Sequence, residues 1–487
     1  MLVCQKSLSA FAWVVYAKKM ACALGVCAFV GREMKNTEKI KFTLRRMFVL
    51  VAALLLFIDL QSPAPAQEAV SSTSTSGTSS STSAASSSTT TADLSTETTA
   101  PSAAVTNSSG AASAMQTGPS GAGVFSPTPV KIYATISGGY DDNVSTLHNK
   151  QGSGFTSGNI LLDYTFGDPR LQLILNGGAG ATYYYEHLSG QSYDIDFKGA
   201  LGITYKSSPR LTLGSSLLVE YLTEPSFNAP GGLNSRNGNY LHTTDNVFVS
   251  YAWVQRFSTK TSYTFEAYNY DNNAVGAFSN RVSNVFGNEF RFQLAPTTNL
   301  VAEYRYDIVS YESASLNSTS HFALGGIDHA FNPRLSATLR GGVEFRSYDQ
   351  DGDHTAPYFE GTVTYAFGKR VSVSWNTRYG LEEPDLVGSQ SRTTFRTGFQ
   401  TKFNLTSRIS SNVDLYFVHD DYQPLNSGSI VTPGFTENTF DGNLSLQYAI
   451  TPLIGVQAGY HYTDVNSDVL LREYSRNRVF AGVNLTF

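Results

Sequence analysis

The stretch RVFAGVNLTF, residues 478–487, ends the chain with apolar side chains at every second position. An alternation of this kind predicts a β-strand with one apolar face and one polar face. The apolar face would hold Val479, Ala481, Val483, Leu485 and Phe487. A sheet that lies in water usually frays at its terminal edge. The sequence therefore raises the question of which medium covers the apolar face.

The same alternation returns in many segments after about residue 128. In LSATLRGGVEFRS, residues 335–347, Leu339 and Phe345 share one face, whereas Arg340 and Glu344 share the other. The segments VSVSWNTRY and TTFRTGFQTKFNL divide in the same way. Each alternation lasts about 10 to 13 residues, the length of a tilted strand that crosses a bilayer. Strands of soluble sandwiches are shorter, so we expect lipid to cover the apolar face.

Short turns recur about every 40 residues, and long polar loops such as PSFNAPGGLNSRNGNYLHT alternate with them. This asymmetry between two rims is typical of outer-membrane barrels. The pattern predicts an all-β fold, a transmembrane antiparallel up-and-down β-barrel of 18 strands, with 16 strands as the alternative. We place the eight short turns at Pro169, Pro209, Ser258, Pro296, Pro333, Lys369, Ser407 and Pro452.

The chain divides into three predicted regions. Residues 1–66 hold an upstream extension and a secretory signal, since the apolar run MFVLVAALLLFI follows basic residues and precedes a small-residue cleavage site ending at Ala66. Residues 67–127 are a disordered tether rich in Ser, Thr and Ala, and residues 128–487 form the barrel. An uncleaved membrane anchor and a glycosylated stalk are the respective alternatives. Because all three cysteines precede Ala66, the secreted chain would carry no disulfide.

Two stretches resemble known families. RVFAGVNLTF resembles the C-terminal signature of outer-membrane β-barrels, which the barrel-assembly machinery recognises, and its five apolar positions match. VKIYATISGGYDDNV, through Gly139, Tyr140, Asp141 and Asn143, resembles the first strand of the putative β-barrel porins. The resemblance implies a barrel in the bacterial outer membrane, in contact with lipid and lipopolysaccharide. Some members of that family accompany exopolysaccharide export.

A barrel of 16 to 18 strands leaves an aqueous lumen, so we expect a porin-like channel for passive diffusion of small hydrophilic solutes. Acidic residues on early strands and basic residues on later ones would set a transverse field; alternatively, the charges pair with Glu303, Glu344 and Glu360. The predicted pore-lining residues are Asp163, Asp194, Asp196, Glu303, Arg305, Arg340, Glu344, Arg346, Glu360, Arg378, Arg396, Lys402, Arg476 and Arg478.

Two other functions stay open, a saccharide export or uptake channel and a structural surface-anchoring barrel. A track of Tyr184, Tyr358 and Tyr416 inside the lumen would favour the first, while girdle positions at the lipid boundary are the plainer expectation. We expect no catalytic residues, because neighbours such as Asp328 and His329 point to opposite faces of a strand.

We expect no cofactor and no metal either. The loop DQDGDHTAPYFE imitates a calcium site but lacks the required glycine and its helices. Cleavage after Ala66 would leave 25 of the 34 basic and 36 of the 39 acidic residues, which disfavours a nucleic-acid partner.

Overall fold

The described part of the chain forms a single ring of 18 antiparallel strands, as predicted, and not 16. The structure is a computed structural model that describes residues 130–186, 192–225, 227, 234–236, 238–312, 316–349, 352–368, 370–386, 389–424, 426–427, 430–431 and 433–487. The predicted signal and tether lie outside these residues. The strands are β1 (Val130–Asp141), β2 (Ser153–Gly167), β3 (Leu171–Tyr184), β4 (Tyr193–Ser208), β5 (Leu211–Leu222), β6 (Tyr240–Val254), β7 (Phe257–Tyr270), β8 (Arg281–Ala295), β9 (Thr298–Tyr311), β10 (Ser318–Asn332), β11 (Leu335–Tyr348), β12 (Asp353–Phe367), β13 (Val371–Glu382), β14 (Ser389–Asn404), β15 (Ile409–Pro424), β18 (Phe435–Ala449), β19 (Ile454–Ser467) and β20 (Tyr474–Thr486).

The ring closes where the first strand of the barrel pairs with the last. β1 and β20 are antiparallel neighbours with a register that runs from Tyr133↔Thr486 to Asp141↔Arg478. Two further backbone bonds between Ile132 and Phe487, of 3.1 and 2.8 Å, continue this seam to the rim. Closure leaves the ring without an unpaired edge, which is the condition for a sheet to lie in hydrocarbon.

Polar side chains shape five of the eight short turns. In each, a side-chain oxygen accepts hydrogen bonds from the backbone N–H groups two and three residues later, the geometry of Asx and Ser/Thr turns. Asn332 Oδ1, for example, accepts from Arg334 at 2.8 Å and from Leu335 at 3.0 Å. The equivalent acceptors are Asp168, Ser208, Thr406 and Thr451. These five turns therefore share one hydrogen-bond pattern, although different polar residues provide the acceptor.

One turn position was predicted wrongly. Ser258 lies within β7, and the turn between β6 and β7 is formed by residues 255–256. This turn contains no proline to fix its dihedral angles and mark its position in the sequence. Lys369 lies outside the described residues, although the turn between β12 and β13 is in the expected place.

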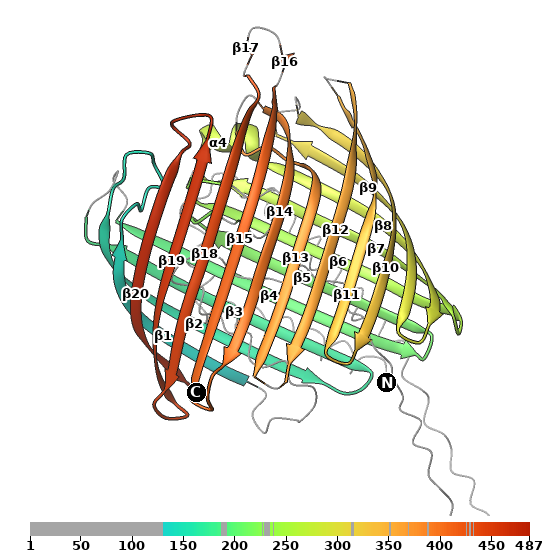
Figure 1. The fold of residues 1–487 in the computed structure, drawn as a ribbon, viewed down its shortest axis with the longest axis horizontal. Coiled ribbons are helices and arrows are strands. Elements are labelled where there is room, and N and C mark those ends of the chain that lie inside the picture. Colours follow the sequence, from blue (N-terminus) through green and yellow to red (C-terminus); the bar gives the residue numbers. More distant parts are fainter. Residues whose placement is uncertain are drawn as a thin grey trace, which may run out of the picture. The chain divides into compact units, whose positions relative to one another are not determined.

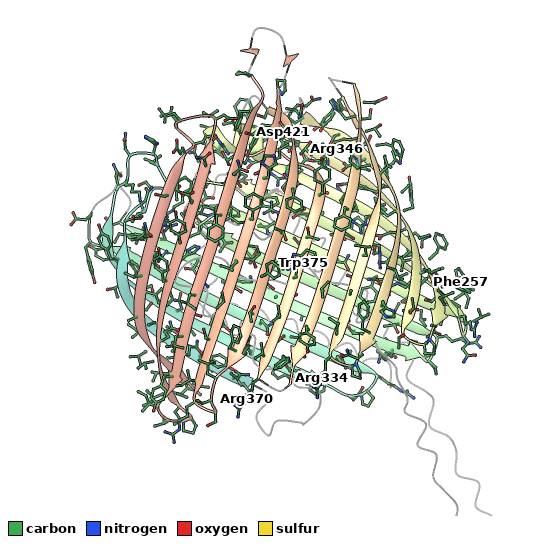
Figure 2. The ribbon with its side chains drawn as sticks, in the orientation of Figure 1. Phe257, Arg334, Arg346, Arg370, Trp375 and Asp421 are labelled. Atoms are coloured by element: carbon green, nitrogen blue, oxygen red, sulfur yellow. The ribbon has the colours of Figure 1, made fainter. Side chains whose placement is uncertain are left out.

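The two faces of the sheet differ in exposure as the alternation predicted. On β20, Val479 and Val483 are 47% and 45% exposed, whereas Phe480 between them is 6% exposed. Trp375 of β13 and Phe399 of β14 stack on the outer face with ring centroids 6.0 Å apart, and Figure 2 shows Trp375 midway between the rims. These aromatic side chains face the surroundings of the barrel.

The long connections gather at the rim opposite the short turns (Figure 1). They include the helix α4 (Asn273–Ser279) and the two short strands β16 (Asn426–Ser427) and β17 (Ile430–Val431). The side chain of Asn272 caps the helix by accepting a 3.0 Å hydrogen bond from Ala274 N. Among the described residues, no helix is long and apolar enough to span a membrane.

Candidate functional site: a loop that crosses the barrel

The connection between β5 and β6, residues 223–239, makes contacts far from the strands it joins. Its described residues are 223–225, 227, 234–236 and 238–239. Asn234, Phe227 and Glu224 reach β14, β15, β18 and β20. We call this connection the crossing loop. In a ring of 18 strands, β14 stands nine strands from β5, halfway around the circumference.

Distances in the ring agree with a loop that reaches from wall to wall. Strands about 4.8 Å apart and tilted by about 40° place opposite walls of an 18-strand barrel about 36 Å apart between backbones. The ten residues from Glu224 to Asn234 span at most about 35 Å when extended. Side chains on both walls shorten the distance that has to be bridged. The crossing loop can therefore connect opposite sides of the bore.

Arginine side chains hold both ends of the crossing loop. Near its start, Glu224 pairs with Arg476 of β20 at 2.5 Å, and Arg478 lies 3.5 Å away. Near its end, Arg236 pairs with Asp194 of β4 at 2.5 Å, and it also donates to Val144 O at 2.7 Å. Burial alone would raise the pKa of Glu224, but the charges of the surrounding arginines hold that pKa well below its usual range. The ends of the loop are therefore fixed by ion pairs at neutral pH.

Asn234 fixes the middle of the loop, and its side chain is 2% exposed. Its Nδ2 donates to Asp420 Oδ2 of β15 at 2.9 Å and to Glu437 Oε1 of β18 at 2.6 Å. Its backbone N–H donates to Asp385 at 3.1 Å, and its carbonyl accepts from the Tyr474 hydroxyl at 2.8 Å. Asn234 thus donates to carboxylates from three separate elements, two through its side-chain amide and one through its backbone N–H.

Phe227 provides an apolar anchor in the same loop. It packs in a buried cluster with Tyr416 and Val418 of β15. Its carbonyl oxygen accepts a hydrogen bond from Arg396 of β14, and Arg396 also pairs with Glu382 of β13 at 3.0 Å. The loop is therefore held on the far wall by packing as well as by hydrogen bonds.

The carboxylates around Asn234 are balanced by two arginines. Arg472 contacts Asp385 at 3.0 Å and Glu437 at 2.9 Å, and Arg392 lies 3.5 Å from Asp420. Asp385 belongs to the loop between β13 and β14. Burial would raise its pKa, yet Arg472 and Arg392 hold that pKa well below the usual range. This anchor stays ionised over the physiological pH range.

Most of the predicted pore-lining charges are paired with neighbours. Arg305 bonds to Glu303 at 2.5 Å and to Glu360 at 2.6 Å, and Arg346 bonds to Glu344 at 2.8 Å. Pairing with these three glutamates was the alternative to a transverse field. Further ion pairs of the predicted set include Arg340 with Asp328, Asp194 with Arg236, Arg396 with Glu382, Arg476 with Asp141 and Glu224, and Arg478 with Glu224.

Five predicted residues have other neighbours. Asp163 lies opposite Lys131 in the β1–β2 register, and Asp196 lies opposite Gly180 in the β3–β4 register. The Arg378 guanidinium lies over the Tyr358 ring at 5.4 Å, and the Arg478 guanidinium lies over the Phe155 ring at 4.3 Å. Lys402 stands in β14 opposite Ser372.

The structure does not gather the three tyrosines into one track. Tyr184, Tyr358 and Tyr416 are all buried, but each belongs to a different apolar cluster. The adjacent Tyr183 and Tyr185 are 46% and 56% exposed, on the outer side, as girdle residues are. In the calcium-like segment, Glu360 is bound to Arg305 and Tyr358, and Asp351 lies outside the described residues. Within the described ranges, no three His, Asp or Glu side chains are grouped to hold a metal ion.

The sequence did not single out Glu224, Phe227, Asn234 and Arg236 as functional residues. Only the length of the loop that holds them was a signal in the sequence, because partners such as Arg476 lie as far as 252 positions away in the chain. Asp385, Arg392 and Arg472 were missed for the same reason.

Comparisons with known proteins place the chain among outer-membrane barrels. The family model described as "Putative beta-barrel porin 2" matches residues 123–487. Solved structures similar to the chain include OccAB4 of Acinetobacter baumannii, at 12% identity with a TM-score of 0.37, covering 74% of this chain and 99% of that one. The outer membrane protein opdK of Pseudomonas aeruginosa, at 9% identity and a TM-score of 0.38, gives the same coverage. The search of curated proteins finds no match.

Proposed function

The chain belongs to the putative beta-barrel porin 2 family, and from this premise we propose that it carries small hydrophilic solutes by passive diffusion through a bore narrowed by the crossing loop. The barrel lies in the bacterial outer membrane, as members of this family do. The observation that carries the proposal is the attachment of Asn234 to β15 and β18 on the far wall. A loop so anchored occupies part of a lumen that 18 strands would otherwise leave wide.

The charged side chains on the inner face of the barrel support a pore lining that suits hydrated solutes of modest size. We assign the fourteen predicted charged residues to the pore lining. Because most of these charges are in ion pairs, few remain uncompensated. The pore lining formed by the strands is therefore polar but has no large net charge of either sign. A solute would meet hydrogen-bonding groups, and its passage would depend on its size more than on a specific chemical group.

Conductance of the purified mature protein in planar lipid bilayers tests this proposal. We expect discrete single-channel steps that scale with salt concentration, and liposome swelling that falls as the sugar in the medium grows larger. A second preparation with Phe227→Ala should pass larger sugars, because that substitution removes the apolar anchor on β15. If the wild-type protein inserts and gives no conductance steps, or if oligosaccharides block the channel at low concentration, passive diffusion is the wrong function.

We further propose that the protein is not an enzyme. Asp328 is buried in an ion pair with Arg340, while His329 bonds to the hydroxyl of Thr298 on the neighbouring strand. The two side chains lie on opposite faces of β10, so they form no acid–base pair. Incubation of the purified barrel with phospholipid and peptide substrates should leave both unchanged.

We propose that Val479, Ala481, Val483, Leu485 and Phe487 present the signal that the barrel-assembly machinery binds. Their support is the exposed apolar face of β20. Substitution Phe487→Ala should lower the amount of assembled barrel in outer-membrane fractions, measured by heat-modifiable migration in gels. Substitution Asn484→Ala, on the other face of the same strand, serves as the matched control. Equal yields of the two variants would contradict this assignment.

A further inference from the structure

Six of the eight short turns carry an arginine at one structurally equivalent position. At this position, the backbone carbonyl accepts a hydrogen bond from the adjacent hairpin, at 2.7 to 2.9 Å in all eight turns. Thr297 and Leu453 occupy it in the remaining two turns. We call the six residues the rim arginines: Arg170, Arg210, Arg256, Arg334, Arg370 and Arg408.

The strand register places the rim arginines on the lumen side of the barrel. Arg334 precedes Leu335, which belongs to the outer face, and it shares the parity of the inward Arg340. Its carbonyl accepts from Ala366 N, and Ala366 shares the parity of the inward Glu360. The other five follow the same rule. Figure 2 shows Arg334 and Arg370 at the rim of the short turns.

The rim arginines are solvent-exposed, and five of the six have no acidic residue in the described part of their turns. All six are in the exposed class. The exception is Arg170, since the Asp168 carboxylate lies in the same turn, accepts the backbone N–H groups of Arg170 and Leu171, and offsets part of the Arg170 charge. This differs from the half-buried Arg472 and the buried Arg476, which are paired on the loop side.

The two rims of the barrel therefore carry opposite charge. The described residues of the long loops include ten acidic and three basic side chains, whereas the short turns include one acidic and six basic side chains. Four of the ten acidic side chains on the loop side, Asp142, Glu224, Glu383 and Asp385, are in ion pairs with basic side chains. The turn side presents free guanidinium groups around an opening.

We infer that the turn-side mouth of the channel is an anion-collecting vestibule, which concentrates small solutes that carry carboxylate or phosphate groups. The inference rests on the proposed channel function. Guanidinium groups suit this role, since their planar donors match carboxylate and phosphate oxygens and keep their charge at every physiological pH. A mouth lined by one sign of charge raises the local concentration of counter-ions.

Geometry sets the size of the expected effect. With six charges about 12 Å from the axis, screened Coulomb attraction at 0.1 M salt enriches a monovalent anion about threefold at the centre of the mouth. At 1 M salt the screening length falls to about 3 Å and the enrichment disappears. The signature of the rim arginines is thus an anion preference that strong salt removes.

The test is the reversal potential of the full mature chain in planar bilayers under a KCl gradient. We expect anions to permeate better than cations near 0.1 M salt, and the preference to vanish near 1 M. Replacing all six rim arginines by glutamine should lower the anion-to-cation permeability ratio by up to about ninefold, because the potential that enriches a monovalent anion about threefold depletes a monovalent cation by the same factor. Replacing all six by lysine keeps the charge and should keep the ratio.

Two triple variants guard against a failure of the sixfold variant to fold. One combines Arg170→Gln, Arg210→Gln and Arg256→Gln, and the other combines Arg334→Gln, Arg370→Gln and Arg408→Gln. Each should give an intermediate ratio.

The outcomes separate the two proposals. Absence of any conductance in the wild-type protein overturns the channel itself. A conducting wild type without anion preference at 0.1 M, or a glutamine variant with an unchanged ratio, overturns only the vestibule. Inorganic phosphate added on the turn side should reduce the chloride current more than phosphate on the loop side. The vestibule is also contradicted if phosphate reduces the chloride current equally from both sides. It is contradicted as well if the rim arginines bind an acidic protein while the channel shows no preference for anions.

Discussion

Substitution of Asn234 by alanine offers a direct way to loosen the crossing loop. The change removes the side-chain amide that donates to Asp420 and Glu437 and leaves the backbone N–H and carbonyl of residue 234 in place. The two carboxylates keep other partners, since Asp420 accepts from Thr394 at 2.6 Å and Glu437 from Arg472 at 2.9 Å. The barrel itself should therefore remain folded.

The structure sets the magnitude. Hydrogen bonds to charged groups contribute about 1.5 to 3 kcal/mol each, so losing two of them weakens the anchor by about 3 kcal/mol even when part of the loss is offset by the remaining partners. At about 1.4 kcal/mol per factor of ten, the population with a detached loop rises about 100-fold. A detached state that is rare in the wild-type channel would become frequent.

Single-channel recording in planar bilayers measures this change as added current noise and as transient steps above the main conductance level. Asn246→Ala is the matched control, because Asn246 donates only to Thr264, at 2.7 Å, on the wall of β6 and β7. Asn234→Asp should disturb the loop more than alanine does, since it adds a carboxylate beside two others. If Asn234→Ala gives the same noise and step frequency as Asn246→Ala, the crossing loop does not control the conductance.

Three other outcomes are expected. The pKa of Asp385 in the folded protein lies below its unfolded value of about 4. Its contribution to loop anchoring is therefore complete above pH 4 and is lost only as the pH falls through the lower folded value. Channel noise should stay constant from pH 5 to 8 and rise below pH 4, and a rise between pH 6 and 7 would exclude this group as the cause. Trp375→Arg, on the outer face midway between the rims, should destabilise the barrel by about 2 to 4 kcal/mol in denaturant titrations with lipid vesicles, and a similar cost for Ser374→Arg on the inner face would refute the lipid-facing assignment. Mass spectrometry of the secreted chain should find Gln67 at its N-terminus, and retention of residues 1–66 would contradict the predicted cleavage.

The fold was predictable because period-two alternation and turn spacing are local properties of the sequence. Val479 and Phe480 differ in exposure as their positions required, and the turns with a proline were placed correctly. The turn at residues 255–256 has no such marker, so its position depended on strand register. Strand number followed from counting these signals.

The crossing loop was not predictable, because its attachment depends on contacts between residues far apart in the sequence. Nothing near Asn234 in the chain indicates that Asp420 and Glu437 will surround its amide. Alternation predicts the face of each charged residue, but the pairing of Arg305 with Glu360 required the register of four strands. Local sequence patterns predict the strands of the barrel wall, whereas the path of the crossing loop is determined only by contacts in the folded barrel.

The seam between β1 and β20 also bears on biosynthesis. Since the strand that completes the ring is the last to be translated, a chain interrupted before Tyr474 would expose the free edges of β1 and β19. Such an incomplete ring would offer unpaired amides to other chains and would be a substrate for periplasmic proteases or for aggregation. The edges of β1 and β19 are therefore withdrawn only when β20 takes its place between them during assembly.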